Sequence, residues 1–163
     1  MGIGCTCCMG NAFYEMKELS KQDEEQLTFA NLWVNGNYKH YLDNIVPLYN
    51  QYELVLVCNK KASLEKLPFK VSKDFRIGTN AWKNDYDIVR EMQRYIAGKE
   101  KLLILFAAGP FGNILAYHLH EINTENTYLD IGSTLDPFLF DGELGKTRGY
   151  LKGLSTLNKM CVW

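Results

Sequence analysis

The chain has 163 residues, of which 47% are hydrophobic and 23% charged, a balance typical of a folded globular protein. Its length favours a single domain. The formal net charge of -1 at pH 7 gives no basic excess of the kind that attracts nucleic acid, so we expect no nucleic-acid partner. The longest apolar run, residues 102–108, is far shorter than the roughly 18 residues of a membrane span, so we expect no transmembrane segment.

The cysteines and the N-terminal residues bear on localisation. An odd number of cysteines, five, without a signal peptide favours a reducing compartment, and we expect a cytoplasmic protein. Cys5, Cys7 and Cys8 look like half of a zinc site, but no second ligand pair follows at a suitable spacing. The opening Met-Gly-Ile-Gly-Cys-Thr also fits the N-myristoylation pattern, with cysteines beside it that are candidates for palmitoylation. Acylation at Gly2 and Cys5 would produce peripheral membrane association.

The first third of the chain predicts a helix, a strand and a second helix. Residues 11–26 have helix-forming composition with apolar residues three apart, and residues 27–34 form an apolar run of strand length. The turn signal Asn35-Gly36-Asn37 ends that strand. Residues 38–52 again show helical spacing, interrupted by a proline.

The middle of the chain continues the alternation. Residues 53–58 form a buried strand, and residues 63–67 predict a short helix that starts at a serine cap and stops before a proline. Residues 70–77 hold one or two short strands. A helix then runs from residue 84 or 85 to residue 97 and stops at a glycine.

The most informative stretch lies between residues 101 and 139. It predicts a buried strand at 102–107, a Gly-Pro turn, a helix at 111–122 and a second strand ending at 130–133. Strand, helix, strand at this spacing is a βαβ unit with parallel strands. Ligands of such sheets bind beyond the carboxyl ends of the strands, so the sequence indicates where a site should lie.

The order of elements predicts an α/β fold, a Rossmann-like three-layer sandwich with a mainly parallel sheet of about five strands. We expect one domain, with an N-terminal helical segment at 1–26, a Rossmann-like core at 27–133 and a glycine-rich, aperiodic tail at 134–163. Long irregular segments of that kind are more often functional than idle.

Gly109 and Pro110 are the first site candidates. They lie between a buried strand and a helix start, where exposed amide groups form an anion-binding point suited to phosphate. The segment AAGPFGN matches neither the dinucleotide fingerprint nor the P-loop, and a purely structural turn is an equal alternative.

Asp130 is the candidate catalytic residue, with Gly132, Ser133 and Asp136 crowding the same loop as substrate-binding candidates. A carboxylate at a strand end can act as a general base or bind a ribose hydroxyl. It can equally cap its own loop by accepting backbone N–H groups.

Further candidates lie outside these two loops. Arg148, with Tyr150 nearby, is a cation able to pair with phosphate, the alternative being a solvated surface arginine. Asn35 and Asn37 offer amides for a sugar or base, although turn formation also explains them. The metal ligands stay unknown: the Asp-Gly-Glu at residues 141–143 has the spacing of some metal-dependent transferases, but two carboxylates in a polar loop are more often solvated.

Several short segments, taken in order, carry a family resemblance. They are FANLWVNGNY, LILFAAGP, TYLDIGS followed by LDP, KTRGY and a closing Cys-x-Trp. Together they resemble the C-terminal portion of the GT-D class of glycosyltransferases from polysaccharide gene clusters and large viruses. The resemblance runs from about residue 27 to residue 163.

The resemblance implies a Rossmann-like fold, a nucleotide-sugar donor, a glycan acceptor and Mn²⁺ or Mg²⁺ as the metal. It places Gly109 and Pro110 at the donor-side turn, Asp130, Gly132 and Ser133 in a second loop, and Arg148 and Tyr150 in a late segment. The family's Arg-x-Gly-Asp-Gly-Glu type motif, which holds the metal and diphosphate, does not precede residue 27. The expectation is therefore a truncated or split form, with a complementing N-terminal fragment as partner, or a domain that binds without transferring.

The sequence thus predicts a glycosyltransferase-like domain that recognises a nucleotide sugar. In an intact mechanism, Asp130 would orient or deprotonate an acceptor hydroxyl, while Arg148 and the amides at Gly109 would stabilise the leaving diphosphate. The alternative is a non-catalytic interaction domain, lipid-anchored at Gly2 and Cys5.

Overall fold

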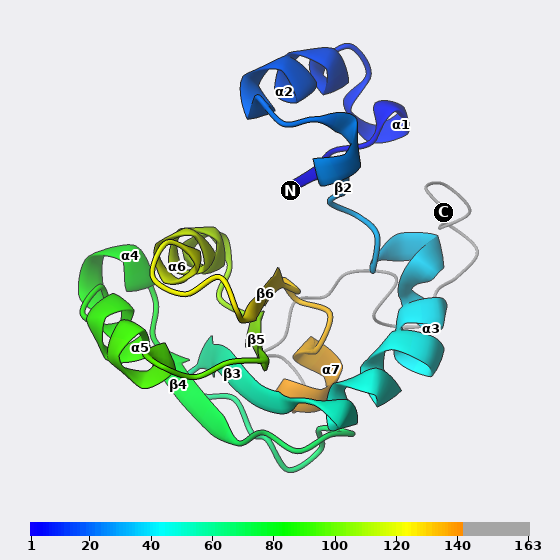
Figure 1. The fold of residues 1–163 in the computed structure, drawn as a ribbon. Helices are drawn as coiled ribbons and strands as arrows, with labels where there is room; N and C mark the ends of the chain where they lie inside the picture. The colour runs from blue at the N-terminus through cyan, green and yellow to red at the C-terminus, as the bar shows by residue number, and fades with distance from the viewer. Residues whose placement is uncertain (142–163) are drawn as a thin grey trace. The chain divides into compact units, whose positions relative to one another are not determined.

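In a computed structural model of the protein, residues 1–141 are described, and they fall into two compact units, residues 1–44 and residues 45–141. Figure 1 shows the chain as a ribbon. The predictions for Arg148, Tyr150 and most of the glycine-rich segment lie outside the described residues.

The first unit is built from short elements. A two-residue strand β1 (Gly2–Ile3) pairs in parallel with β2 (Thr28–Phe29). The helices of this unit are α1 (Thr6–Met9), α2 (Ala12–Ser20), a 3₁₀ turn (Glu24–Gln26), a second 3₁₀ turn (Asn35–Asn37) and α3 (Tyr38–His40).

The strand expected over residues 27–34 is wrong beyond Phe29. The chain turns there, because the amide of Leu32 donates to the carbonyl of Phe29 and that of Val34 to Asn31. These local turns use the groups that a longer strand would offer to a neighbour. The apolar run therefore adds no strand to the main sheet.

The helical stretch after Asn37 passes from α3 through a π turn (Tyr41–Ile45) to a 3₁₀ helix (Val46–Gln51). Pro47 lies in the first turn of that last segment, where a missing N–H costs little. The predicted proline interruption is thus a change of helix type.

The second unit is a parallel α/β sheet, as the sequence predicts. Its strands are β3 (Glu53–Asn59), β4 (Lys73–Ile77), β5 (Leu102–Phe106) and β6 (Thr127–Asp130). They are ordered β4-β3-β5-β6, and every neighbouring pair is parallel. This sheet has four strands rather than about five, because the segment at 27–34 does not join it.

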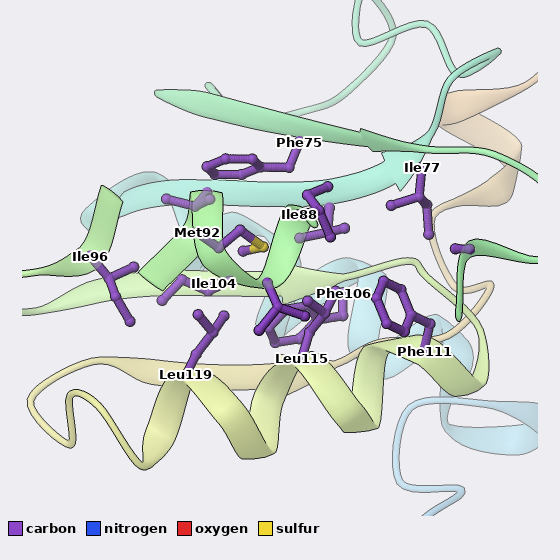
Figure 2. Packing of buried hydrophobic residues seen from close by; sticks show 14 of the residues in the cluster. Phe75, Ile77, Ile88, Met92, Ile96, Ile104, Phe106, Phe111, Leu115 and Leu119 are labelled. Carbon is purple, nitrogen blue, oxygen red and sulfur yellow. The ribbon is translucent and has the colours of Figure 1, made fainter. Parts of the chain in front are cut away.

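Helices cover both faces of this sheet (Figure 1). On one face, side chains of β3 and β5 pack with α4 (Ala81–Asn84), α5 (Ile88–Ile96) and α6 (Pro110–His120). Figure 2 shows Met92, Ile104 and Leu115 meeting in this layer. The opposite face is covered by the 3₁₀ helix Val46–Gln51 and by α7 (Asp136–Leu139). The Rossmann-like, three-layer arrangement is confirmed for this unit.

Two details of the second unit differ from the sequence prediction. The helix expected from residue 84 or 85 to 97 is present as α5 but starts later, at Ile88, and a separate short helix, α4, precedes it. Residues 63–67 form no helix: the hydroxyl of Ser63 accepts the amide of Glu65, and the Ser63 amide donates to the carbonyl of Leu139. The serine here closes a local turn instead of capping a helix.

Cys58 yields a pH prediction. It is fully buried in β3, and burial raises the pKa of its thiol to about 11. A raised folded-state pKa means that the thiol contributes stability which is complete below pH ~9 and lost as the pH rises through about 11. We expect about 3 kcal/mol less unfolding free energy from this group across that range.

The measurement is urea unfolding of the wild type and Cys58→Ala at pH 8 and pH 11. At pH 8 the alanine variant should have a lower unfolding free energy than the wild type. Between pH 8 and pH 11 its unfolding free energy should fall by less than that of the wild type. An identical loss in both proteins would contradict the assignment.

Candidate site at the carboxyl edge of the sheet

The four parallel strands place their carboxyl ends at one edge of the second unit. After β3 the chain passes to the face covered by the 3₁₀ helix, where Phe69 packs on Tyr49. After β5 it passes to the opposite face through α6. Neighbouring strands whose connections leave toward opposite faces open a crevice beyond their ends, the usual ligand position in open parallel sheets.

The turn between β5 and α6 is made by Gly109 and Pro110. Gly109 has φ 58° and ψ -152°, a conformation in which a side chain would be strained. Pro110 then begins the helix, and the amide of Gly112 donates to the Gly109 carbonyl at 2.9 Å. The predicted Gly-Pro turn at a helix start is therefore present.

Asp130 lies against that turn. A Cβ added at Gly112 would stand 3.5 Å from both Cγ and Oδ2 of Asp130, and 3.0 Å from the Cβ of Phe106. The Asp130 carboxylate therefore lies within van der Waals reach of the first turn of α6, and the tighter contact at Gly112 is the one with Phe106. The start of a helix carries partial positive charge, which stabilises a carboxylate placed there.

The two oxygens of Asp130 have different surroundings. Oδ1 accepts the amide of Gly132 at 2.9 Å and so shapes the turn in which Gly132 adopts φ 54°. Oδ2 is the oxygen directed at Gly112, and the residue as a whole is exposed. The capping role considered from the sequence is therefore real, and it leaves the carboxylate at the surface of the edge.

A cation at the same edge was not anticipated from the sequence. Lys60 follows β3, and its ammonium lies 2.7 Å from Oδ1 of Asp85, while Oδ2 of Asp85 accepts the amide of Gly78 at 2.9 Å. The Lys60 side chain is 59% exposed, whereas that of Asp85 is 13% exposed. The signal available in the sequence was a lysine directly after a buried strand.

The other predicted site residues divide into three groups. Ser133 and Asp136 follow β6, and the Ser133 carbonyl accepts the amide of Asp136, which is buried at the start of α7. Asn35 and Asn37 belong to the first unit, where Asn35 has φ 56° and Asn37 is buried. Arg148 and Tyr150 lie outside the described residues. The structure thus brings Gly109, Pro110, Asp130 and Gly132 to one edge.

The metal predicted from the family resemblance finds no assembled site in the part of the chain that the structure describes. No three His, Cys, Asp or Glu side chains among residues 1–141 come together as metal ligands. We therefore assign no ligands for Mn²⁺ or Mg²⁺ at this edge.

The N-terminal residues considered for zinc or acylation are part of the first unit. Gly2 pairs with Thr28 in the small sheet, Cys5 is buried and Cys8 is exposed. This unit also contains a cavity of about 370 Å³, lined by Ile3, Phe13, Lys17, Glu24, Leu27, Thr28 and Phe29. Acylation stays a prediction.

Among the described residues, no helix is both long and apolar enough to cross a membrane. Comparison with protein-family models, with curated proteins and with solved structures finds no match to this chain.

The Lys60–Asp85 pair can be tested by acid unfolding. The hydrogen bond from Lys60, followed by that from the Gly78 amide, lowers the pKa of the Asp85 carboxyl. A lowered folded-state pKa means that the carboxylate contributes stability above its unfolded pKa of about 4 and that this contribution is lost as the pH falls through the folded value.

We therefore expect Asp85→Asn to have a lower urea midpoint than the wild type at pH 7. At pH 3 the two midpoints should lie closer together. Urea midpoints at the two pH values provide the measurement. Glu125→Gln, which changes an exposed carboxylate at the amino end of β6, is the control. A constant difference between Asp85→Asn and wild type at both pH values would contradict the account.

Proposed function

We propose that this chain is a glycosyltransferase-like domain that recognises a nucleotide sugar at the carboxyl edge of its parallel sheet. The observation that carries the proposal is the approach of the exposed Asp130 carboxylate to the glycine-lined first turn of α6. An exposed carboxylate whose Oδ1 accepts a backbone amide is suited to bind a hydroxyl group of ribose or of an acceptor sugar.

The charges along the edge match the parts of such a ligand. Lys60 after β3 is a cation, the Gly109 turn presents a helix start, and Asp130 after β6 is an anion. Since neighbouring strands lie about 4.8 Å apart, the ends of β3 and β6 are separated by about 10 Å. A phosphate suits the lysine end of this line, and a hydroxyl group suits the carboxylate end.

The chemistry at the carboxylate follows from its position. A hydroxyl group donating to Asp130 would be oriented by the fixed carboxylate, which can accept the proton as the oxygen attacks the donor sugar. The leaving diphosphate would be stabilised by Lys60 and the amides at the Gly109 turn, with Arg148 as a further predicted cation. Transfer itself would also require the Asp and Glu of the family's motif, which does not precede residue 27.

Thermal-shift measurements test this proposal. We expect UDP-, GDP- or TDP-sugars to raise the unfolding temperature of the wild type, measured with and without Mn²⁺, because a ligand bound to the folded state stabilises it by mass action. Asp130→Asn should unfold close to the wild-type temperature without ligand. It should bind the sugar nucleotide about tenfold to a hundredfold more weakly, since it loses a charged hydrogen-bond acceptor.

Glu125→Gln is again the matched control, because it removes an exposed carboxylate at the opposite end of β6. It should bind like the wild type. The absence of a shift with any sugar nucleotide would contradict the proposal, and a ligand-free Asp130→Asn protein that is already unfolded would show Asp130 to be a structural cap.

A further inference from the structure

Aromatic side chains gather where α4 meets the first turn of α6. Trp82 is 57% exposed and Tyr86 is 41% exposed, and their ring centres lie 5.0 Å apart with the ring planes at 86°. Phe111 lies behind them, its ring centre 6.3 Å from Trp82 and 6.2 Å from Tyr86. Because α4 follows β4 and α6 follows β5, this aromatic corner belongs to the carboxyl edge of the sheet.

Trp82 is close to the charged groups of the candidate site. The amide of Asp85 donates to the carbonyl of Ala81 at 2.8 Å, so the helical spacing of α4 extends to Asp85. Residues three apart on a helix are neighbours, so Trp82 lies on the same side of α4 as Asp85, whose carboxylate binds the Lys60 ammonium. On its other side Trp82 contacts Phe111, the residue before Gly112.

The indole of Trp82 has room for a planar partner. Within residues 1–141 its ring contacts, with Tyr86 and Phe111, are both edge-to-face, at 86° and 76°, so no ring lies parallel to it. Tyr86, in contrast, is held by a hydrogen bond between its hydroxyl group and Nε2 of His118 at 3.1 Å. A tryptophan exposed by more than half, three residues from the carboxylate that binds Lys60, is a suitable platform for a flat group that carries a phosphate.

We propose that Trp82 stacks on the base of a nucleotide whose phosphate is bound by Lys60. This inference rests on the proposed function and assigns the base-binding part of that site. A lysine ammonium has three N–H donors, so the contact with Asp85 leaves donors for a phosphate oxygen. The nearby cation favours a nucleotide over a neutral glycan, which would use the aromatic ring but not the charge.

The experiment is isothermal titration of UDP, GDP and TDP, and of glucose 1-phosphate as a ligand without a base. Loss of a base–aromatic stack weakens binding by a factor of about 5 to 150. We therefore expect Trp82→Ala to lower the affinity for nucleoside diphosphates by about tenfold or more. Glucose 1-phosphate should bind unchanged. Lys60→Met should lower the affinity for the nucleoside diphosphates and for glucose 1-phosphate. Trp82→Phe should keep most of the wild-type affinity for nucleotides.

Tyr52→Ala serves as the matched control. Tyr52 is 49% exposed and precedes β3 at the amino edge of the same sheet, so its removal deletes an exposed aromatic ring far from the proposed platform. Its affinities should equal those of the wild type. Unfolding temperatures of all variants, recorded without ligand, establish that they are folded.

Three results would overturn the inference. If Trp82→Ala binds nucleoside diphosphates as tightly as the wild type, Trp82 does not stack on the base, whereas the proposed nucleotide recognition is unaffected. If Trp82→Ala weakens the binding of glucose 1-phosphate to the same degree, the ring contacts the sugar and not the base. If the wild type binds none of the three nucleotides, the inference and the proposed function fail together.

Discussion

The parallel pairing of β5 with β3 on one side and β6 on the other is the constraint on which the candidate site depends. All five residues of β5 are buried, and Phe106 at its end pairs in register with Val57 and Asp130. This register brings the end of β6 beside the start of α6. A different register would separate the carboxylate of Asp130 from the turn at Gly109.

The packing at Gly112 turns that register into the arrangement of the candidate site. The backbone of α6 passes close to both Phe106 and Asp130, and a Cβ at Gly112 would crowd the Cβ of Phe106 at 3.0 Å. Burial of Phe111 and Leu115 fixes the same helix against the sheet (Figure 2). The apolar core therefore determines where the exposed polar groups lie, and Asp130 is held by the sheet and by its own turn at the same time.

The sequence predicts the second unit well and the first unit poorly, for a physical reason. Strands β3 and β5 are apolar runs of strand length, and α5 and α6 have long apolar stripes, so their patterns are unambiguous. Residues 27–34 are equally apolar, but beyond Phe29 they form local turns. The apolar pattern alone cannot distinguish a segment that pairs with a neighbouring strand from one that does not.

The candidate site shows the same division. The glycine turn and Asp130 follow predictable strands, so their meeting could be inferred from parallel topology alone. The Lys60–Asp85 pair and the position of Trp82 depend on the break between α4 and α5, which side-chain contacts determine and periodicity does not reveal.

The central claim is that a nucleotide sugar binds across the carboxyl edge of the β4-β3-β5-β6 sheet. Amide hydrogen exchange, followed by mass spectrometry with and without saturating UDP-glucose, GDP-mannose or TDP-glucose, tests it most directly. The account predicts slower exchange for at least one of these ligands in residues 59–61, 78–86, 107–113 and 130–133, with the amino edge of the same sheet unaffected. Protection confined to the first unit, or no protection with any of the three ligands, would contradict it.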